Sequence, residues 1–163
     1  MAGSNNTNPF STAGIKLKYA IEATSGTRPS SGYTELTSVV SLPSLNAEPS
    51  TLDVTDLSEL EYKQSIPGLK DAGNFALKCN LTQAVIEAWN TLVSSTTEAS
   101  GGRKRAWFEI VMPPASGYTK SFFFSGYPVK AGFPGADVDQ PFQGEMSITV
   151  SKVDGWQTAS TQS

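Results

Sequence analysis

The sequence predicts a mainly β domain with one α-helix and one long acidic excursion. Apolar residues alternate with polar ones in several short runs, and one other run has helical spacing. The runs are separated at turn-like positions by many of the 14 glycines and 10 prolines. A chain of 163 residues, 38% hydrophobic and 17% charged, suits a single soluble globular domain.

The first part of the chain predicts two strands of unequal strength. In the first strand every second residue is apolar: Ile15, Leu17, Tyr19 and Ile21. After a turn-rich stretch, Leu36, Val40 and Leu42 fall on one face of a weaker run. Pro43 should end this second strand, because proline cannot donate to the hydrogen-bond ladder.

Residues 46–73 predict an excursion from the body of the domain. Short β-like pieces stand here among turn residues, so we expect a long projecting loop or hairpin at about residues 46–70. The segment holds six acidic residues and two lysines, a net charge of −4, whereas the rest of the chain sums to +1. The acidity of the protein is therefore local.

A strand followed directly by a helix is predicted next. The strand at 75–81 alternates cleanly and points Cys79 inward. The helix, at about residues 82–93, has Thr82 as a suitable N-cap. Its apolar stripe comprises Val85, Ile86, Trp89, Leu92 and Val93. Beyond the helix, residues 94–102 have no periodicity and predict a flexible connection.

The last three predicted strands, at 106–112, 118–127 and 145–152, carry apolar side chains on both faces. Trp107 and Val111 share one such face, and Phe122–Phe124 places aromatic rings on both. Either the helix or another subunit must cover the surplus, and the pattern leaves both open. We expect residues 1–13 to be a flexible arm, 14–153 the domain, and 154–163 a flexible tail.

Composition argues against an enzyme. The chain has no histidine, which removes the commonest general base, and one cysteine, which excludes an intrachain disulfide. Acidic pairs (Glu59/Glu61 or Asp53/Asp56) are more often solvated loops than glycosidase sites, and Asp53, Asp56 and Glu59 match no EF-hand spacing. We therefore expect no catalytic residues, no metal and no cofactor.

The net charge and the amino-terminal residues bear on nucleic-acid binding and on where the protein is made. A net charge of −3 and a pI near 4.9 do not favour tight binding of nucleic acid, although Arg103–Arg105 is a small basic cluster. The first residues lack the basic and apolar parts of a secretory signal, which predicts synthesis in the cytoplasm without a membrane association.

The order of several segments resembles the major tail tube proteins of long-tailed, siphophage-type bacteriophages and related prophages. The segments, given by their first and last residues, are Gly14–Tyr19, Thr51–Leu57, Ile66–Asp71, Phe75–Leu81, Glu87–Leu92, Trp107–Ile110 and Lys120–Gly126. Together they span most of residues 14–150, and none is a catalytic motif.

The resemblance implies a β-barrel or sandwich flanked by one helix, with six copies in a ring and rings stacked into a hollow tube. As a virion protein made in the host bacterial cytoplasm, it would bind itself, the tape measure protein, the tail terminator and the tail-tip initiator. Viral DNA would pass through the lumen during ejection without specific binding. The family's long early loop matches residues 46–70. Candidates for inter-ring contacts are Asp53, Asp56, Glu59, Glu61, Lys63 and Lys70, and candidates for apolar inter-subunit contacts are Trp107, Val111 and Phe123.

Two other functions remain compatible with the sequence. The protein could be another tail component of related fold. It could instead be a soluble β-sandwich that binds carbohydrate on exposed aromatic residues, for which Trp107, Tyr118 and Tyr127 are candidates.

Overall fold

A computed structural model describes residues 13–24, 26–46, 48–54, 65–71, 73–97 and 104–160. Its elements in chain order are β1 (Lys16–Ile21), β2 (Thr34–Leu36), β3 (Val39–Ser41), β4 (Glu48–Asp53), β5 (Ser65–Asp71), β6 (Asn74–Asn80), α1 (Gln83–Thr97), β7 (Ala106–Val111), a 3-10 turn (Pro114–Ser116), β8 (Lys120–Pro128) and β9 (Gln143–Thr158). The fold is mainly β with one helix among the described residues, as the sequence predicts.

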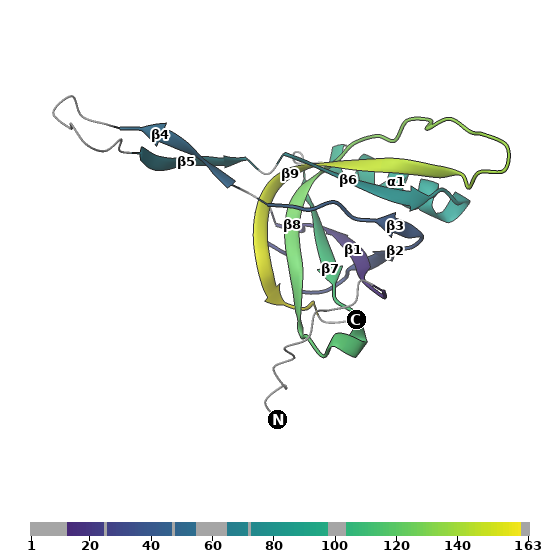
Figure 1. The fold of residues 1–163 in the computed structure, drawn as a ribbon. Helices are drawn as coiled ribbons and strands as arrows, with labels where there is room; N and C mark the ends of the chain where they lie inside the picture. Colours follow the sequence, from purple (N-terminus) through teal and green to yellow (C-terminus); the bar gives the residue numbers. More distant parts are fainter. Residues whose placement is uncertain are drawn as a thin grey trace.

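Within the described ranges, seven strands form one antiparallel sheet in the order β2-β1-β7-β8-β9-β6-β3. The sheet curls into a nearly closed barrel, with the short strands β2 and β3 at its two edges (Figure 1). The core follows from the alternation of side chains along each strand. Leu17 on β1, Phe108 on β7 and Phe124 on β8 point inward, and the residues next to each of them in the sequence point outward. The predicted β-barrel or sandwich with one helix is confirmed.

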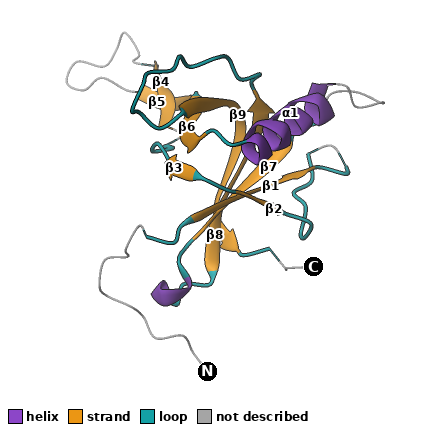
Figure 2. Cartoon of the chain, turned by 90° about the vertical axis from the view of Figure 1, so that its right-hand side faces the viewer, coloured by secondary structure: helices purple, strands orange, loops and turns teal. Residues whose placement is uncertain are grey.

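The helix α1 packs against the sheet and completes its core (Figure 2). Val85, Trp89 and Leu92 are buried, as the helical spacing predicts. The backbone N–H of Val85 donates to Thr82 Oγ1 at 3.3 Å, which confirms Thr82 as the N-cap.

The helix ends later than predicted, at Thr97 instead of residue 93. The extra turn is polar and therefore shows no apolar stripe. Its hydroxyls are satisfied inside the helix, since Ser95 Oγ donates to the Thr91 carbonyl oxygen at 2.8 Å and Thr96 Oγ1 to that of Val93 at 2.9 Å. Residues 98–102 of the predicted connection lie outside the described part of the chain.

The predicted excursion at 46–70 is a two-stranded hairpin of β4 and β5, called the arm below. Leu52 pairs with Ile66, and the register shifts between Pro49 and Thr51. The arm extends away from the barrel (Figure 1). A projecting hairpin was one of the two predicted forms, and it is confirmed.

Two strand predictions need correction. We expected a strand at 145–152 and a tail from 154, but β9 reaches Thr158 because it follows the whole length of β8. Gly155, with φ of 76°, and two register shifts let one strand bend around the barrel where we expected the tail to begin. The second prediction placed Leu36, Val40 and Leu42 on one face of a single strand. Ser38, with a φ of 64°, separates β2 from β3 and breaks this alternation, so Val39 packs on the core and Val40 is exposed.

Candidate functional site

The outward face of β7 and β8 is covered by the chain itself. Trp107 and Phe123 are 0% and 1% exposed. The guanidinium carbon of Arg28 lies 4.4 Å from the Phe123 ring centroid, and the Tyr33 ring meets Phe123 edge-on at 5.9 Å. The connection between β1 and β2 therefore covers this face. From the sequence we expected the helix or another subunit to cover it.

Two buried carboxylates tie neighbouring segments to this face, Glu22 the β1–β2 connection and Glu109 the residues after β9. Glu22 accepts hydrogen bonds from the backbone N–H of Arg105 at 2.9 Å and of Gly26 at 3.0 Å, and from Trp107 Nε1 at 3.3 Å. Glu109 accepts from the backbone N–H of Ser160 at 3.1 Å and from its hydroxyl. A buried carboxylate that is fully hydrogen-bonded in this way serves the fold, so we assign both residues a structural role.

The ionisable groups on and near this face show the effect of burial. Burial, and secondarily the Glu109 carboxylate, raise the pKa of Tyr33. On the opposite, inward face of the sheet, burial raises the pKa of the Cys79 thiol to about 11. Cys79 lies in the core, as predicted, and a thiol with that pKa is not a nucleophile near neutral pH.

The residues predicted to make apolar contacts between subunits are largely covered in the single chain. Trp107 and Phe123 are already covered by their own chain, and Val111 is half-buried. Their contact with another subunit stays a prediction, without support from exposed surface. The carbohydrate platform is wrong for Trp107, because a fully buried indole offers no face to a sugar. Tyr118 is exposed and instead meets Trp156 edge-on at 5.8 Å.

The predicted inter-ring residues lie on or near the arm. Asp53 ends β4 and is exposed. Lys70 lies in β5 opposite Pro49. The other four candidates, Asp56, Glu59, Glu61 and Lys63, lie outside the described residues.

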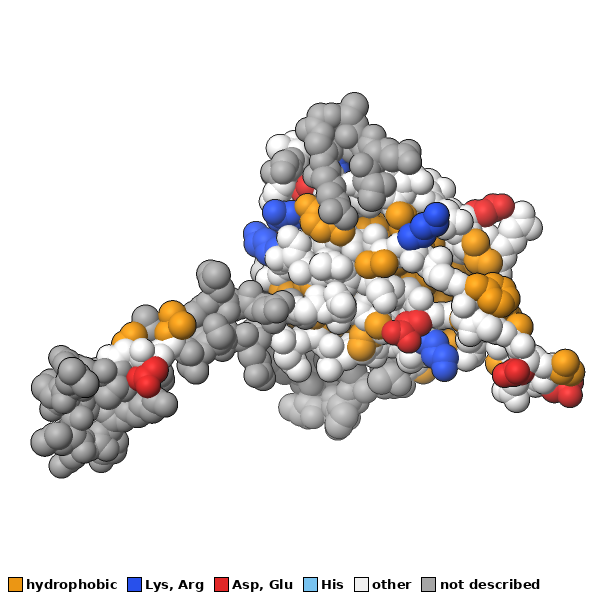
Figure 3. Space-filling model, turned by 90° about the horizontal axis from the view of Figure 1, so that it is seen from above, with side chains coloured by type: hydrophobic (Ala, Val, Ile, Leu, Met, Phe, Trp, Pro, Cys, Tyr) orange, Lys and Arg blue, Asp and Glu red, His pale blue; other side chains and the backbone are white. Residues whose placement is uncertain are grey.

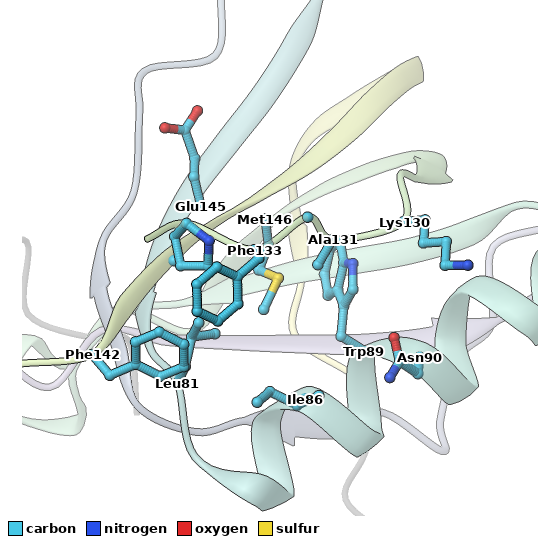
Figure 4. Close-up of a pocket in the computed structure, with 13 residues that line it drawn as sticks. Leu81, Ile86, Trp89, Asn90, Lys130, Ala131, Phe133, Phe142, Glu145 and Met146 are labelled. Carbon is cyan, nitrogen blue, oxygen red and sulfur yellow. The ribbon is translucent and has the colours of Figure 1, made fainter. Parts of the chain in front are cut away.

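An apolar pocket of about 390 Å³ lies at the side of the barrel where α1 packs (Figure 4). Its walls come from the first turns of α1 and the residue before them, the start of β9 and the connection between β8 and β9. The larger apolar side chains that line it are Leu81, Ile86, Trp89, Phe133, Phe142 and Met146, with Lys130, Asn90 and Glu145 as its polar side chains. We call this set the α1 pocket.

Two contacts shape the α1 pocket. Trp89 Nε1 donates to the carbonyl oxygen of Val129 at 2.9 Å, which ties the β8–β9 connection to the helix. The rings of Phe133 and Phe142 lie 5.7 Å apart at its rim, and Phe133 is 80% exposed. The sequence pattern did not predict this pocket, although Phe133 and Phe142 in a Pro- and Gly-rich segment were an available signal.

The described residues contain no group of three His, Cys, Asp or Glu side chains placed to hold a metal ion. None of the described helices is long and apolar enough to cross a membrane. Large apolar side chains are exposed on the arm and beside the α1 pocket, and also at Tyr118 and Trp156.

Comparisons with known proteins show the fold. No protein-family model and no curated protein matches the sequence. A chain in the cryo-EM structure of the anti-feeding prophage baseplate has a TM-score of 0.63 and 8% identity, over 96% of this chain and 100% of that one. A chain in the sheath/tube terminator of an extracellular contractile injection system has a TM-score of 0.62 and 12% identity, over 93% and 98%.

A third similar chain comes from the anti-feeding prophage cap, a tube-terminating cap, with a TM-score of 0.59 and 13% identity over 98% of this chain and 100% of that one. At these identities the similarity shows the fold alone. It is a fold used in tail-like injection assemblies, and it does not single out the siphophage tail tube family.

Proposed function

We propose that this protein is a non-enzymatic structural subunit of a phage-type tail, which forms hexameric rings that stack into a hollow tail tube. DNA would pass through that tube during ejection, and the subunit would contact the tape measure, terminator and tail-tip initiator proteins. One observation carries the proposal: the similarity to subunits of tail-like assemblies extends over nearly the whole of both chains. Barrel and helix are thus shared as one unit.

The shape of the subunit supports stacking. The arm leaves one side of the barrel, and the β8–β9 connection extends from the other side (Figure 1). Unlike features at opposite ends of a subunit are compatible with head-to-tail contacts, which can repeat along an axis. The arm's net charge of −4 against +1 for the rest favours such contacts between unlike surfaces.

An acidic protein also suits a DNA conduit. With a net charge of −3, the subunit lacks the excess of lysine and arginine that holds phosphates in place. A lumen formed by such subunits would let DNA slide.

A second candidate function is a terminal ring that stands once at one end of a tube. The observation in its favour is that two of the similar chains come from a sheath/tube terminator and a tube-terminating cap. Both candidates predict rings, and they differ in whether rings stack on one another.

Sedimentation velocity over a concentration series tests the proposal and separates the candidates. The full chain is compared with a variant in which residues 48–71 are replaced by a short Gly-Ser turn. A tube subunit should give species larger than one ring, and the variant should stop at single rings. A terminal subunit should stop at one ring with or without the arm. Absence of any ring, even with a purified tail-tip initiator, would contradict both.

A further inference from the structure

Apolar side chains are exposed at two opposite ends of the molecule (Figure 3). On the arm, Leu52 and Val54 are 53% and 45% exposed. At the other end, Phe133 and Ile86 expose apolar surface at the rim of the α1 pocket. We infer that the α1 pocket of one copy receives Leu52 and Val54 from the arm of a second copy. This inference rests on the proposed function and names the surface that the arm contacts.

The α1 pocket has the shape of a socket for aliphatic side chains. Its floor is firm, because Trp89 and Met146 are 1% exposed and the Trp89 indole is hydrogen-bonded. Its rim is formed by Phe133 and Phe142, which extend over the cavity (Figure 4). Its volume of about 390 Å³ is large enough for the two side chains of the arm.

The chemistry of the lining favours a protein segment over a small molecule. Small-molecule sites place several polar groups so that they converge on the ligand. Here the polar side chains stand at the margin, with Lys130 and Asn90 at one end and the Glu145 carboxylate pointing away from the aromatic rings (Figure 4). An apolar occupant fits this lining better than a polar one.

Charge favours approach of the arm from the Lys130 side. Lys130 is a cation in the lining, and the arm carries a net charge of −4. Glu145 stands directly opposite Lys78 in the pairing of β6 and β9, which offsets its charge. Asp137 and Asp139 lie further along the same connection, near its turn at 138–140, and disfavour approach from there.

The occupant must come from a second copy. The arm and the β8–β9 connection lie on opposite sides of the barrel in Figure 1, and Figure 2 agrees, because the arm lies behind the barrel there. One chain therefore cannot fill its own pocket. Each copy offers one arm and one socket, so the contact is head-to-tail and can continue from copy to copy.

Cross-linking between variants that each carry one introduced, exposed cysteine tests this contact. Leu52→Cys and Phe133→Cys proteins are mixed, assembled and treated with a short bismaleimide, then separated on a denaturing gel. Cys79 needs no replacement, because it is fully buried and its thiol is protonated near neutral pH. The matched control replaces Phe133→Cys with Val40→Cys, another exposed apolar position, 48% exposed on β3 at the barrel edge.

We expect a cross-linked dimer from the Leu52→Cys and Phe133→Cys mixture, and at least about tenfold less from either variant alone or from the control mixture. Independently, Leu52→Ser with Val54→Ser should raise the concentration needed for stacking about tenfold or more, whereas Val40→Ser should not.

The outcomes separate this inference from the proposed function. Stacked rings that yield the dimer support both. Stacked rings that give no dimer, or as much from the control pair, overturn the α1 pocket as the receiving surface and leave the tube proposal standing. A wild-type protein that never forms rings, with or without initiator, overturns the proposed function and this contact together.

Discussion

The outward face of β7 and β8 and the α1 pocket are both rich in aromatic residues, but they differ in what covers them. Trp107 and Phe123 lie under the β1–β2 connection, held by Glu22 and Arg28. Phe133 has no such cover in the described chain and is 80% exposed. A large aromatic side chain that its own chain covers stabilises the fold, whereas an exposed apolar patch, such as that of Phe133 with Phe142, indicates an interaction site.

The largest expected effect on folding is at the covered face. Trp107→Ala removes a fully buried ring and leaves the Glu22 carboxylate without one of its donors. We expect the free energy of unfolding to fall by about 3–5 kcal/mol, measured by urea denaturation. A loss below about 1 kcal/mol would contradict the account of this face.

A substitution at Gly126 tests how closely β8 and β9 pack against each other. A Cβ at Gly126 would lie 2.3 Å from the Thr149 carbonyl oxygen, whereas a Cβ at Gly132 would meet nothing within 4 Å. Gly126→Ala should destabilise the fold by about 1–3 kcal/mol. Gly132→Ala is the matched control and should change stability by less than about 0.5 kcal/mol in the same denaturation experiment.

The covering connection depends on the buried carboxylate. Glu22→Gln places an amide where three N–H groups donate, so one donor loses its acceptor. We expect a loss of about 1–3 kcal/mol. Glu35→Gln breaks an exposed ion pair with Lys16, 3.9 Å long, and should cost less than about 0.5 kcal/mol. Equal losses in the two variants would show that Glu22 does not hold the connection.

Alkaline pH should weaken the fold. Burial raises the pKa of Cys79 from 9.0 to about 11, and it also raises the pKa of Tyr19 and Tyr33. The folded state therefore retains protons that the unfolded state releases, so stability is full below pH 9 and declines as the pH rises toward 11. In urea midpoints measured from pH 7 to 11, Cys79→Ala should show a smaller decline than the wild type.

The smallest expected effect on folding is at the exposed end. Phe133→Ser should change the free energy of unfolding by less than about 0.5 kcal/mol, because the ring is mostly in water. The same change should reduce stacking of rings, measured by sedimentation. A variant that unfolds would show that the phenylalanine serves the barrel and not an interface.

Much of the fold follows from local periodicity. Alternation predicts β1 and β6, and helical spacing predicts the start of α1, because each of these elements has one face in the core. The end of α1 escapes prediction because it is polar, and the last residues of β9 escape prediction because Gly155, with a positive φ, interrupts their alternation. They are held by hydroxyl-to-carbonyl bonds and by pairing with β8, which no apolar pattern records.

The candidate site is harder to predict from the sequence. The cover over Trp107 comes from a connection without periodicity, and its decisive contacts join residues 85 positions apart, as between Glu22 and Trp107. The α1 pocket likewise depends on how residues 129–142 cross the helix. The acidic arm was predictable because charge and turn residues are local properties, whereas the surface it meets is not.

Electron microscopy of the purified protein would show whether it stacks into tubes. Negative-stain images over a concentration series, with and without a purified tail-tip initiator, would show the assembled state. We expect hollow tubes, or stacked rings with sixfold symmetry, that lengthen with concentration. A protein that stays monomeric under all these conditions would contradict it.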